Sequence, residues 1–282
     1  MGTICAGQGV ISLSNPTKSS YNLSLKLEIG SPTCIEPCES FYSYYTLNAT
    51  PLDISPTSEV WTCVKISNKK KRSVKIIPKS SLPSYIILEQ KVQNTFENLK
   101  KVKFKFLIKL YKVYESRDYY YVVTEYIPHG SLADMIEEFE LDERKVVKIV
   151  RQLLDSASLL GNFGVWMYDL RPENLFLAEV CKLDVKLNAF TLRNILKDGF
   201  ENSCFSFPVP GICRVNEKNI VWSIGMIAVY LITGKEMQDL DRQLEDMELD
   251  TKDFIKETLN KNPNLRVSIK EALDHAWILN NS

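Results

Sequence analysis

Several residue types that would point to a particular class of protein are scarce in this chain of 282 residues. It has only two histidines, and its seven cysteines include no C-x-x-C pair, so nothing indicates a zinc site or a disulfide framework. The longest apolar run, residues 220–233, is too short to cross a membrane and has no signal-peptide flanks. Basic and acidic residues number 35 each, so no net charge would draw the chain to nucleic acid. We expect reduced thiols and no nucleic-acid partner.

The composition that remains is typical of a soluble globular protein with one or two domains, at 45% hydrophobic and 25% charged residues. The first part, residues 1–41, is rich in Gly, Ser, Asn, Thr and Pro and has little periodicity. This pattern predicts a flexible extension. Residues 42–282 carry the regular apolar patterns and are expected to form the folded domain.

The extension begins with the letters MGTICA, which resemble a signal for N-myristoylation at Gly2 beside a palmitoylation site at Cys5. Ala6 departs from the Ser or Thr that completes the usual signal, and an unmodified terminus is the alternative. Because a single myristoyl chain binds membranes only marginally, the second acyl group at Cys5 would be needed for stable anchoring. We therefore expect the protein at the cytoplasmic face of a membrane.

Alternating apolar residues predict a β-hairpin from residues 60–66 and 73–77, joined by a polar turn. A basic run lies at or beside the tip of this hairpin and comprises Lys69, Lys70, Lys71 and Arg72. Such a run is most often a solvated turn, but next to an acylated terminus it would add attraction to an anionic membrane surface. Further along, residues 142–162 place apolar side chains at helical spacing and predict an amphipathic helix.

The loop that follows this helix, residues 167–174 with the letters MYDLRPEN, resembles the catalytic loop H-R-D-L-x-x-x-N of protein kinases. In that resemblance Asp169 is the catalytic base and Asn174 a metal ligand. The strand at residues 73–77 resembles the V-A-I-K strand of kinases, which puts Lys75 where the α- and β-phosphates of ATP are gripped.

Residues 104–110 and 119–126 look like the fourth and fifth kinase strands, after which Glu125 and Ile127 would lie in the hinge beside ATP. The C-terminal letters NPNLR and ALDHAWI are similar to those of calcium/calmodulin-dependent kinases and of the calcium-dependent kinases of plants and apicomplexan parasites. The resemblance implies an α+β, bilobal fold with a β-rich small lobe at about 42–127. The helical large lobe would span about 128–282, with a reduced segment after the helix at 220–233.

Several residues that kinases need are absent. The Gly-rich loop would fall on residues 53–58, which contain no glycine, and the helix glutamate that pairs with the lysine would fall on Thr95. Ala189 stands where kinases carry the Mg²⁺-binding aspartate, and Ile220 stands where an aspartate anchors the catalytic loop. The letters FPVPG at 207–211 replace the A-P-E motif.

These absences predict a pseudokinase that acts as a scaffold or allosteric regulator, with no cofactor and no metal. Its partner would be a protein, such as an active kinase or its substrate, and without EF-hand loops we expect no calcium binding. Lys75, Glu125, Ile127 and Asn174 would then be vestiges of an ATP cleft. The alternative is an atypical Ser/Thr kinase in which Lys75 and Asp169 still act on ATP and a metal. A third interpretation, a fragment without stable lobe packing, is disfavoured by the regular apolar patterns.

Overall fold

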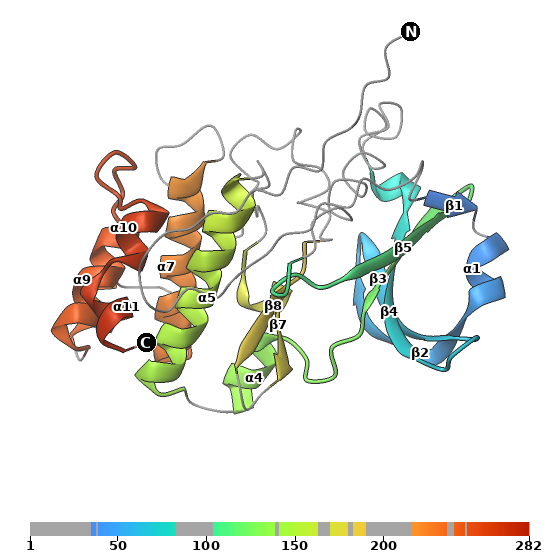
Figure 1. Cartoon of the computed structure of the whole chain (residues 1–282), viewed down its shortest axis with the longest axis horizontal. Helices are drawn as coiled ribbons and strands as arrows, with labels where there is room; N and C mark the ends of the chain where they lie inside the picture. Colours follow the sequence, from blue (N-terminus) through green and yellow to red (C-terminus); the bar gives the residue numbers. More distant parts are fainter. Residues whose placement is uncertain are drawn as a thin grey trace, which may run out of the picture.

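The computed structural model describes residues 35–37, 39–82, 104–138, 141–162, 170–179, 183–189, 216–235, 240–245 and 247–281. Within these residues a small lobe built on one β-sheet is followed by a large lobe built mainly of helices (Figure 1). An apolar core continues from the inner face of the sheet into the helices. The predicted α+β, bilobal fold is confirmed.

The small lobe contains a six-stranded sheet in the order β1-β5-β6-β4-β3-β2. Strands β2 to β6 pair antiparallel with their neighbours, whereas β1 runs parallel to β5. The bounds are β1 Ile35–Pro37, β2 Tyr45–Ser55, β3 Ser58–Lys65, β4 Lys71–Pro78, β5 Leu110–Glu115 and β6 Tyr119–Glu125, and the 3-10 turn η1 (Lys79–Ser81) follows β4. The predicted hairpin, now β3 and β4, is confirmed.

The prediction of a strand over residues 104–110 is wrong for most of its length, because β5 begins only at Leu110. The apolar residues before it leave the sheet and turn toward the large lobe. Leu107 forms a parallel bridge with Leu187, and the N–H of Ile108 donates to the carbonyl of Leu187 at 2.9 Å. The apolar pattern of this segment therefore reflects burial between the lobes rather than a place in the small sheet.

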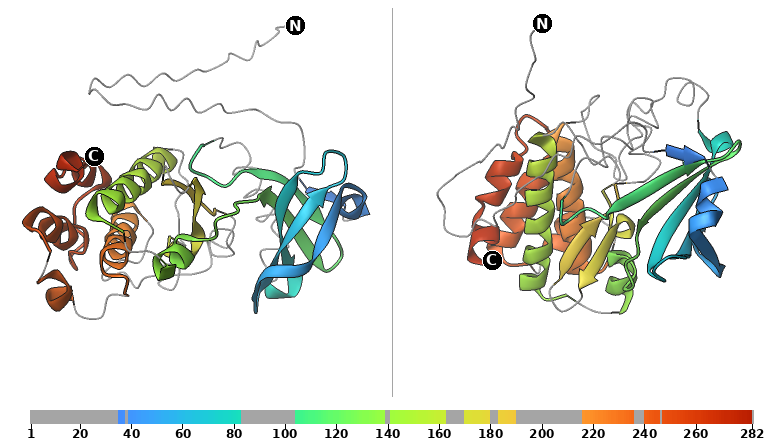
Figure 2. Two further views of the ribbon diagram at one scale, coloured as in Figure 1. Left: turned by 90° about the horizontal axis from the view of Figure 1, so that it is seen from below. Right: turned by 45° about the vertical axis from the view of Figure 1, so that its right-hand side comes forward.

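The folded small lobe begins before Tyr42, the residue at which the sequence placed its start. Strand β1 extends the sheet, and the helix α1 (Glu39–Tyr44) covers the face turned away from the large lobe (Figures 1 and 2). Phe41 on this helix is completely buried, with its ring stacked on Tyr121 at 5.1 Å and packed edge-on against Tyr114 at 5.6 Å. The last part of the predicted extension is therefore structural.

The large lobe combines helices with one small hairpin. The helices are α4 (Leu132–Glu138), α5 (Glu143–Asn162), α7 (Glu217–Thr233), α8 (Leu240–Leu244), α9 (Leu249–Thr258), α10 (Ile269–Leu273) and α11 (Ala276–Asn280). The hairpin consists of β7 (Leu175–Glu179) and β8 (Asp184–Leu187), and the 3-10 turn η2 (Pro172–Asn174) precedes it. The helix predicted over 142–162 is confirmed, because the apolar face of α5 is buried as its spacing required.

Helix α7 lies in the middle of the large lobe and is buried along most of its length. It begins with a capping box in which Asn216 accepts from Lys218 and Asn219 accepts from Asn216, and it ends at Gly234 in the left-handed conformation. Gly225 lets α9 approach closely, since a Cβ there would lie 2.5 Å from Oγ1 of Thr258. Among the described residues, no helix is both long and apolar enough to span a bilayer.

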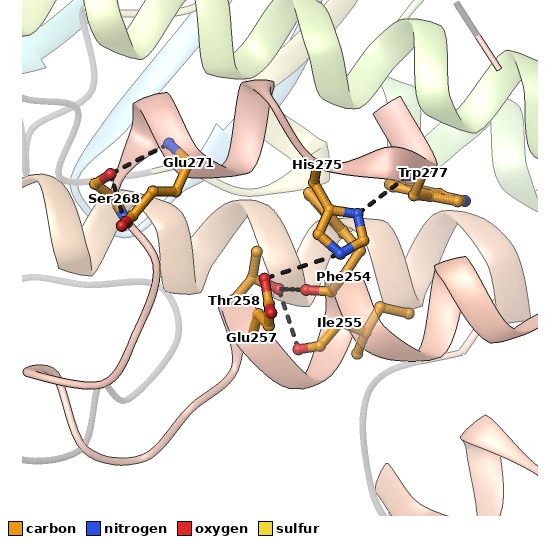
Figure 3. A network of polar contacts seen from close by, with 8 residues as sticks. All are labelled: Phe254, Ile255, Glu257, Thr258, Ser268, Glu271, His275 and Trp277. Atoms are coloured by element: carbon orange, nitrogen blue, oxygen red, sulfur yellow. Dashed lines mark hydrogen bonds and ion pairs between the residues drawn. The ribbon is translucent and has the colours of Figure 1, made fainter. Parts of the chain in front are cut away.

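The C-terminal helices are joined by a polar network around His275 (Figure 3). Nδ1 of His275 accepts from the N–H of Trp277 at 3.1 Å and so caps α11. The rings of His275 and Trp277 pack on Phe254, at 5.4 and 4.5 Å between centroids. Nε1 of Trp277 also donates to Oε1 of Glu143 at 2.7 Å, which joins α11 to α5. His275 is therefore a packing and capping residue.

Candidate nucleotide-binding site

Lys75 lies in the middle of the small sheet, on β4 between Val60 of β3 and Val122 of β6. Its side chain is half-buried. Because side chains alternate along a strand, Lys75 shares a face with Ile77, which belongs to the core that continues into the large lobe. Val74 faces the other way, toward α1. The structure therefore places this lysine on the side of the sheet where kinases bind ATP.

The turn between β2 and β3 occupies the predicted place of the Gly-rich loop. Only Pro56 and Thr57 lie between the paired residues Ser55 and Ser58. The Ser55 hydroxyl donates to the carbonyl of Ser58 at 2.8 Å and accepts from its N–H at 3.1 Å. A phosphate-binding loop needs outward-pointing N–H groups. Here Pro56 has none and the N–H of Ser58 is already used, so this turn is poorly equipped to hold phosphate.

The end of the predicted catalytic loop is held beside the strand that leads to Ala189. The turn η2 closes with a hydrogen bond from the N–H of Asn174 to the carbonyl of Arg171 at 3.0 Å. The carbonyl of Asn174 in turn accepts from the N–H of Asn188 at 2.9 Å. The structure thus brings together Asn174 and the position of the missing metal aspartate, whereas Asp169 lies outside the described residues.

Ala189 is 5% exposed and belongs to the main apolar core. Its methyl group offers no ligand to a cation, and Mg²⁺ in proteins is held by carboxylates together with substrate phosphates. Asn188, the neighbouring residue, is half-buried, and in an extended chain its side chain points to the opposite side. Among the residues that the structure describes, no group of His, Cys, Asp and Glu side chains gathers to hold a metal ion.

The two predicted hinge residues are Glu125, the last residue of β6, and Ile127, which follows the strand. The carboxylate of Glu125 accepts from Nζ of Lys186 on β8 at 2.5 Å and from the N–H of Lys109 at 3.2 Å. The N–H of Glu125 donates to the carbonyl of Lys109 at 2.9 Å. Ile127 is half-buried in the connection to α4. The side chain of Glu125 is thus committed to a contact between the lobes, which sequence reasoning missed.

Arg266, from the NPNLR letters, is buried at 1% exposure near the start of α7. It donates from Nε to the carbonyl of Asn260 at 2.9 Å and from Nη1 to the carbonyl of Lys218 at 2.8 Å, and it lies over the ring of Trp222 at 4.8 Å. Burial lowers the pKa of its guanidinium to about 10, which leaves the group charged at neutral pH. Within the described parts of the chain its partners are carbonyls and a ring, so its role there is structural.

Two further residues singled out in the sequence, Ile220 and Cys63, are buried and have no group that could act in catalysis. Ile220, where kinases carry an anchoring aspartate, is 1% exposed in the core. Cys63 is a free, buried thiol whose pKa is raised to about 12 by desolvation, which makes it unreactive. The helix position Thr95, the letters FPVPG at 207–211 and the acylation residues Gly2 and Cys5 lie outside the described residues.

The two lobes, with Lys75 on the inner face of the sheet and Asn174 beside the end of β8, define a protein of the kinase class. A family model described as the protein kinase domain matches residues 56–278. The chain therefore belongs to the protein kinase family. The matched region includes Lys75, Glu125, Ile127, Asp169, Asn174 and Ala189.

Similar proteins of known name are kinases. A probable myosin light chain kinase of Dictyostelium discoideum is 28% identical over 80% of each chain, and a second is 30% identical over 66% of this chain and 54% of its own. Myosin light chain kinase family member 4 of Homo sapiens is 26% identical over 84% of this chain and 67% of its own. The more specific resemblance to calcium-dependent kinases stays a prediction.

A solved structure, Rad53 1-466 in complex with AMP-PNP, has a TM-score of 0.67 to this chain. It is 21% identical and covers 84% of this chain and 66% of the Rad53 chain. At this identity the likeness concerns the fold alone. It agrees with the bilobal architecture described above.

Proposed function

We propose that this protein is a catalytically inactive, kinase-like scaffold or allosteric regulator. The observation that carries the proposal is the buried methyl of Ala189 at the place of the metal-binding aspartate. Phosphoryl transfer depends almost wholly on positioning and on neutralising phosphate charge, and the metal supplies much of that neutralisation. A site whose remaining metal ligand is the neutral amide of Asn174 would bind Mg²⁺·ATP weakly.

The β2–β3 turn supports the same proposal, because it is poorly suited to bind the phosphates of ATP. Kinases cover the phosphates with glycines whose N–H groups approach them closely. Here the Ser55 hydroxyl accepts a hydrogen bond from the N–H of Ser58. The exposed Asp53 adds negative charge near the position that the phosphates would occupy. We therefore expect neither ATP nor Mg²⁺ to be a cofactor.

A scaffold role is supported by how the lobes are joined. The ion pair between Glu125 and Lys186 links β6 to β8, and backbone hydrogen bonds link Leu187 to Phe106 at 2.7 Å and to Ile108 at 2.9 Å. These contacts fix the lobes to each other through the protein's own groups. A kinase-like surface with a set lobe arrangement suits recognition of a protein partner, such as an active kinase or its substrate, better than a cycle of nucleotide-driven closure.

The alternative is an atypical Ser/Thr kinase with weak or metal-independent activity, in which Lys75 and Asp169 act on ATP held in an unusual pose. It is favoured by the position of Lys75 on the inner face of the sheet and by the kinase names of the relatives. The calcium-dependent type of kinase, suggested by the C-terminal letters, belongs to this candidate.

An assay of phosphate transfer distinguishes the two proposed functions. Purified wild-type protein is expected to incorporate no labelled phosphate from ATP into itself or into generic Ser/Thr substrates, with either Mg²⁺ or Mn²⁺. The Asp169→Asn variant, measured beside it, should give the same background because there is no activity for the substitution to remove. Incorporation by the wild type that disappears in Asp169→Asn would establish the atypical kinase instead.

The location we propose is the cytoplasmic face of a membrane, with myristate on Gly2 and palmitate on Cys5. Support comes from the N-terminal letters, which place both acceptor residues within the first five positions. Two acyl chains bind much more durably than one. The basic run at Lys69, Lys70, Lys71 and Arg72 would assist, since these residues form the β3–β4 turn and the start of β4.

A further inference from the structure

The small lobe carries a cluster of cations and exposed tyrosines that extends beyond the basic run. We call it the basic face, and it consists of Lys69, Lys70, Arg72, Lys109, Lys112, Tyr42 and Tyr44. Its centre is the ring of Tyr111, which is packed against the aromatic core under α1. Arg72 lies 4.0 Å and Lys109 lies 5.2 Å from the centroid of this ring. Strand β4 and the residue directly before β5, far apart in sequence, therefore contribute cations to one surface.

The face is continuous with helix α1. The N–H of Ile66, at the β3–β4 turn, donates to the carbonyl of Tyr44 at 2.8 Å, so the basic turn abuts the end of the helix. Nζ of Lys112 lies 5.7 Å from the ring of Tyr44. Tyr42 and Tyr44 are 56% and 48% exposed, although both are large aromatic residues. Cationic side chains and accessible rings thus alternate on the end of the molecule that α1 covers.

The charge of this face is local. Among the described residues, Lys69, Lys70 and Lys109 form no ion pair with a carboxylate. Glu125, the last residue of β6, lies opposite Arg72 in the sheet register, and its carboxylate is bound by Lys186. Because the whole chain has equal numbers of basic and acidic residues, this concentration of positive charge is a property of one surface.

We propose that the basic face lies flat against an anionic lipid bilayer. Lysine and arginine side chains are attracted to acidic headgroups, and tyrosine rings favour the interface between headgroups and acyl chains. The segment that carries Gly2 joins the described fold at β1, directly before α1, which contributes Tyr42 and Tyr44 to this face. In this orientation the large lobe points away from the membrane, because α1 and the large lobe lie at opposite ends of the molecule (Figure 2).

The inference rests on the proposed membrane location but not on acylation itself. It can therefore be tested on unacylated full-length protein made in bacteria. The measurement is sedimentation with vesicles of phosphatidylcholine alone or of phosphatidylcholine mixed with phosphatidylserine. We expect binding that requires phosphatidylserine and weakens as salt is raised, because the attraction is screened by ions.

The decisive variant reverses three exposed charges, Lys69→Glu, Lys70→Glu and Lys109→Glu, and leaves the half-buried Arg72 and Lys112 intact. It should bind phosphatidylserine vesicles about 100-fold or more weakly. The matched control makes the same change in charge on the large lobe and comprises Lys256→Glu, Lys261→Glu and Lys270→Glu, all at exposed positions. The control should bind as the wild type does.

Two results would overturn the proposal. One is the absence of phosphatidylserine-dependent binding, which would leave the face to an acidic protein partner. The other is an equal loss in both variants, which would show a response to net charge rather than to this face. Neither result bears on acylation, because the protein tested carries no lipid. A failure of the lipid anchor would appear separately, as unchanged membrane association of a Gly2→Ala variant in cells.

Discussion

Replacing Phe41 with alanine is expected to lower the stability of the small lobe by about 3–5 kcal/mol, the usual cost of removing a buried phenylalanine. The ring is completely buried and packs on the buried rings of Tyr45, Tyr114 and Tyr121 at centroid distances of 5.4, 5.6 and 5.1 Å, and the exposed Tyr42 lies against it at 5.0 Å. Without it, α1 loses its main attachment to the sheet. The loss should appear as faster hydrogen exchange of amides in β4 and β6 and as an earlier denaturation of the small lobe.

The matched control is the neighbouring residue on the same helix, Tyr42, which is 56% exposed. Its replacement by alanine should cost no more than about 1 kcal/mol. If Phe41→Ala changes hydrogen exchange no more than Tyr42→Ala does, α1 is not part of the folded lobe, and the domain begins where the sequence alone suggested.

The second large effect concerns the membrane anchor. In cells that supply N-myristoyltransferase, Gly2→Ala is expected to reduce the membrane-pelleted fraction on the order of tenfold or more, because the acceptor amine of the first acyl chain is lost. Cys5→Ser should leave a weaker association that washes off, since one myristoyl chain binds only marginally. Fractionation followed by immunoblotting measures both.

Thr3→Ala serves as the control, because Thr3 adjoins the acceptor glycine without carrying the lipid. It should pellet as the wild type does. A Gly2→Ala protein that pellets to the same extent as wild type would show that the N-terminal letters are not a lipid signal.

Much of the fold could be predicted because its patterns are long and regular. The face of α5 follows from apolar residues at helical spacing, and the β3–β4 hairpin follows from two alternating runs joined by a polar turn. Segment 35–44 was missed for the opposite reason. Strand β1 and helix α1 are too short to show a period, and what stabilises them is packing on β5 and on the tyrosines of the sheet.

The candidate site was predictable where residues keep their order along the chain. Lys75 lies on β4, Asn174 lies in η2 and Ala189 follows β8, which are the elements to which counting along the sequence assigned them. Their roles in a site stay predictions. The ion pair between Glu125 and Lys186 could not be found this way, because the two residues are far apart in sequence and meet only when the lobes pack. Only part of the basic face was predicted. The basic run is continuous in sequence, whereas Lys109 and Lys112 come close to it only when the strands of the sheet pair.

The apolar pattern of residues 104–110 led to a wrong prediction. Phe106, Leu107 and Ile108 form a continuous apolar run such as a buried strand of the small sheet would have, yet they are buried against Leu187 in the large lobe. Such a run predicts a buried segment, but it does not say which partner covers it. Here the partner is β8, which leads to Ala189.

The central claim, that Ala189 and the glycine-free turn leave the protein without a working nucleotide site, is tested most directly by a nucleotide titration. The melting temperature would be followed as ATP is added, with Mg²⁺, with Mn²⁺ and without metal. Occupancy at about 100 times the dissociation constant stabilises a folded protein by roughly 2.7 kcal/mol, which is several degrees for a domain of ordinary size. We predict no saturable change under any of the three conditions. A saturable, metal-dependent rise at millimolar ATP would contradict the account and favour the atypical kinase.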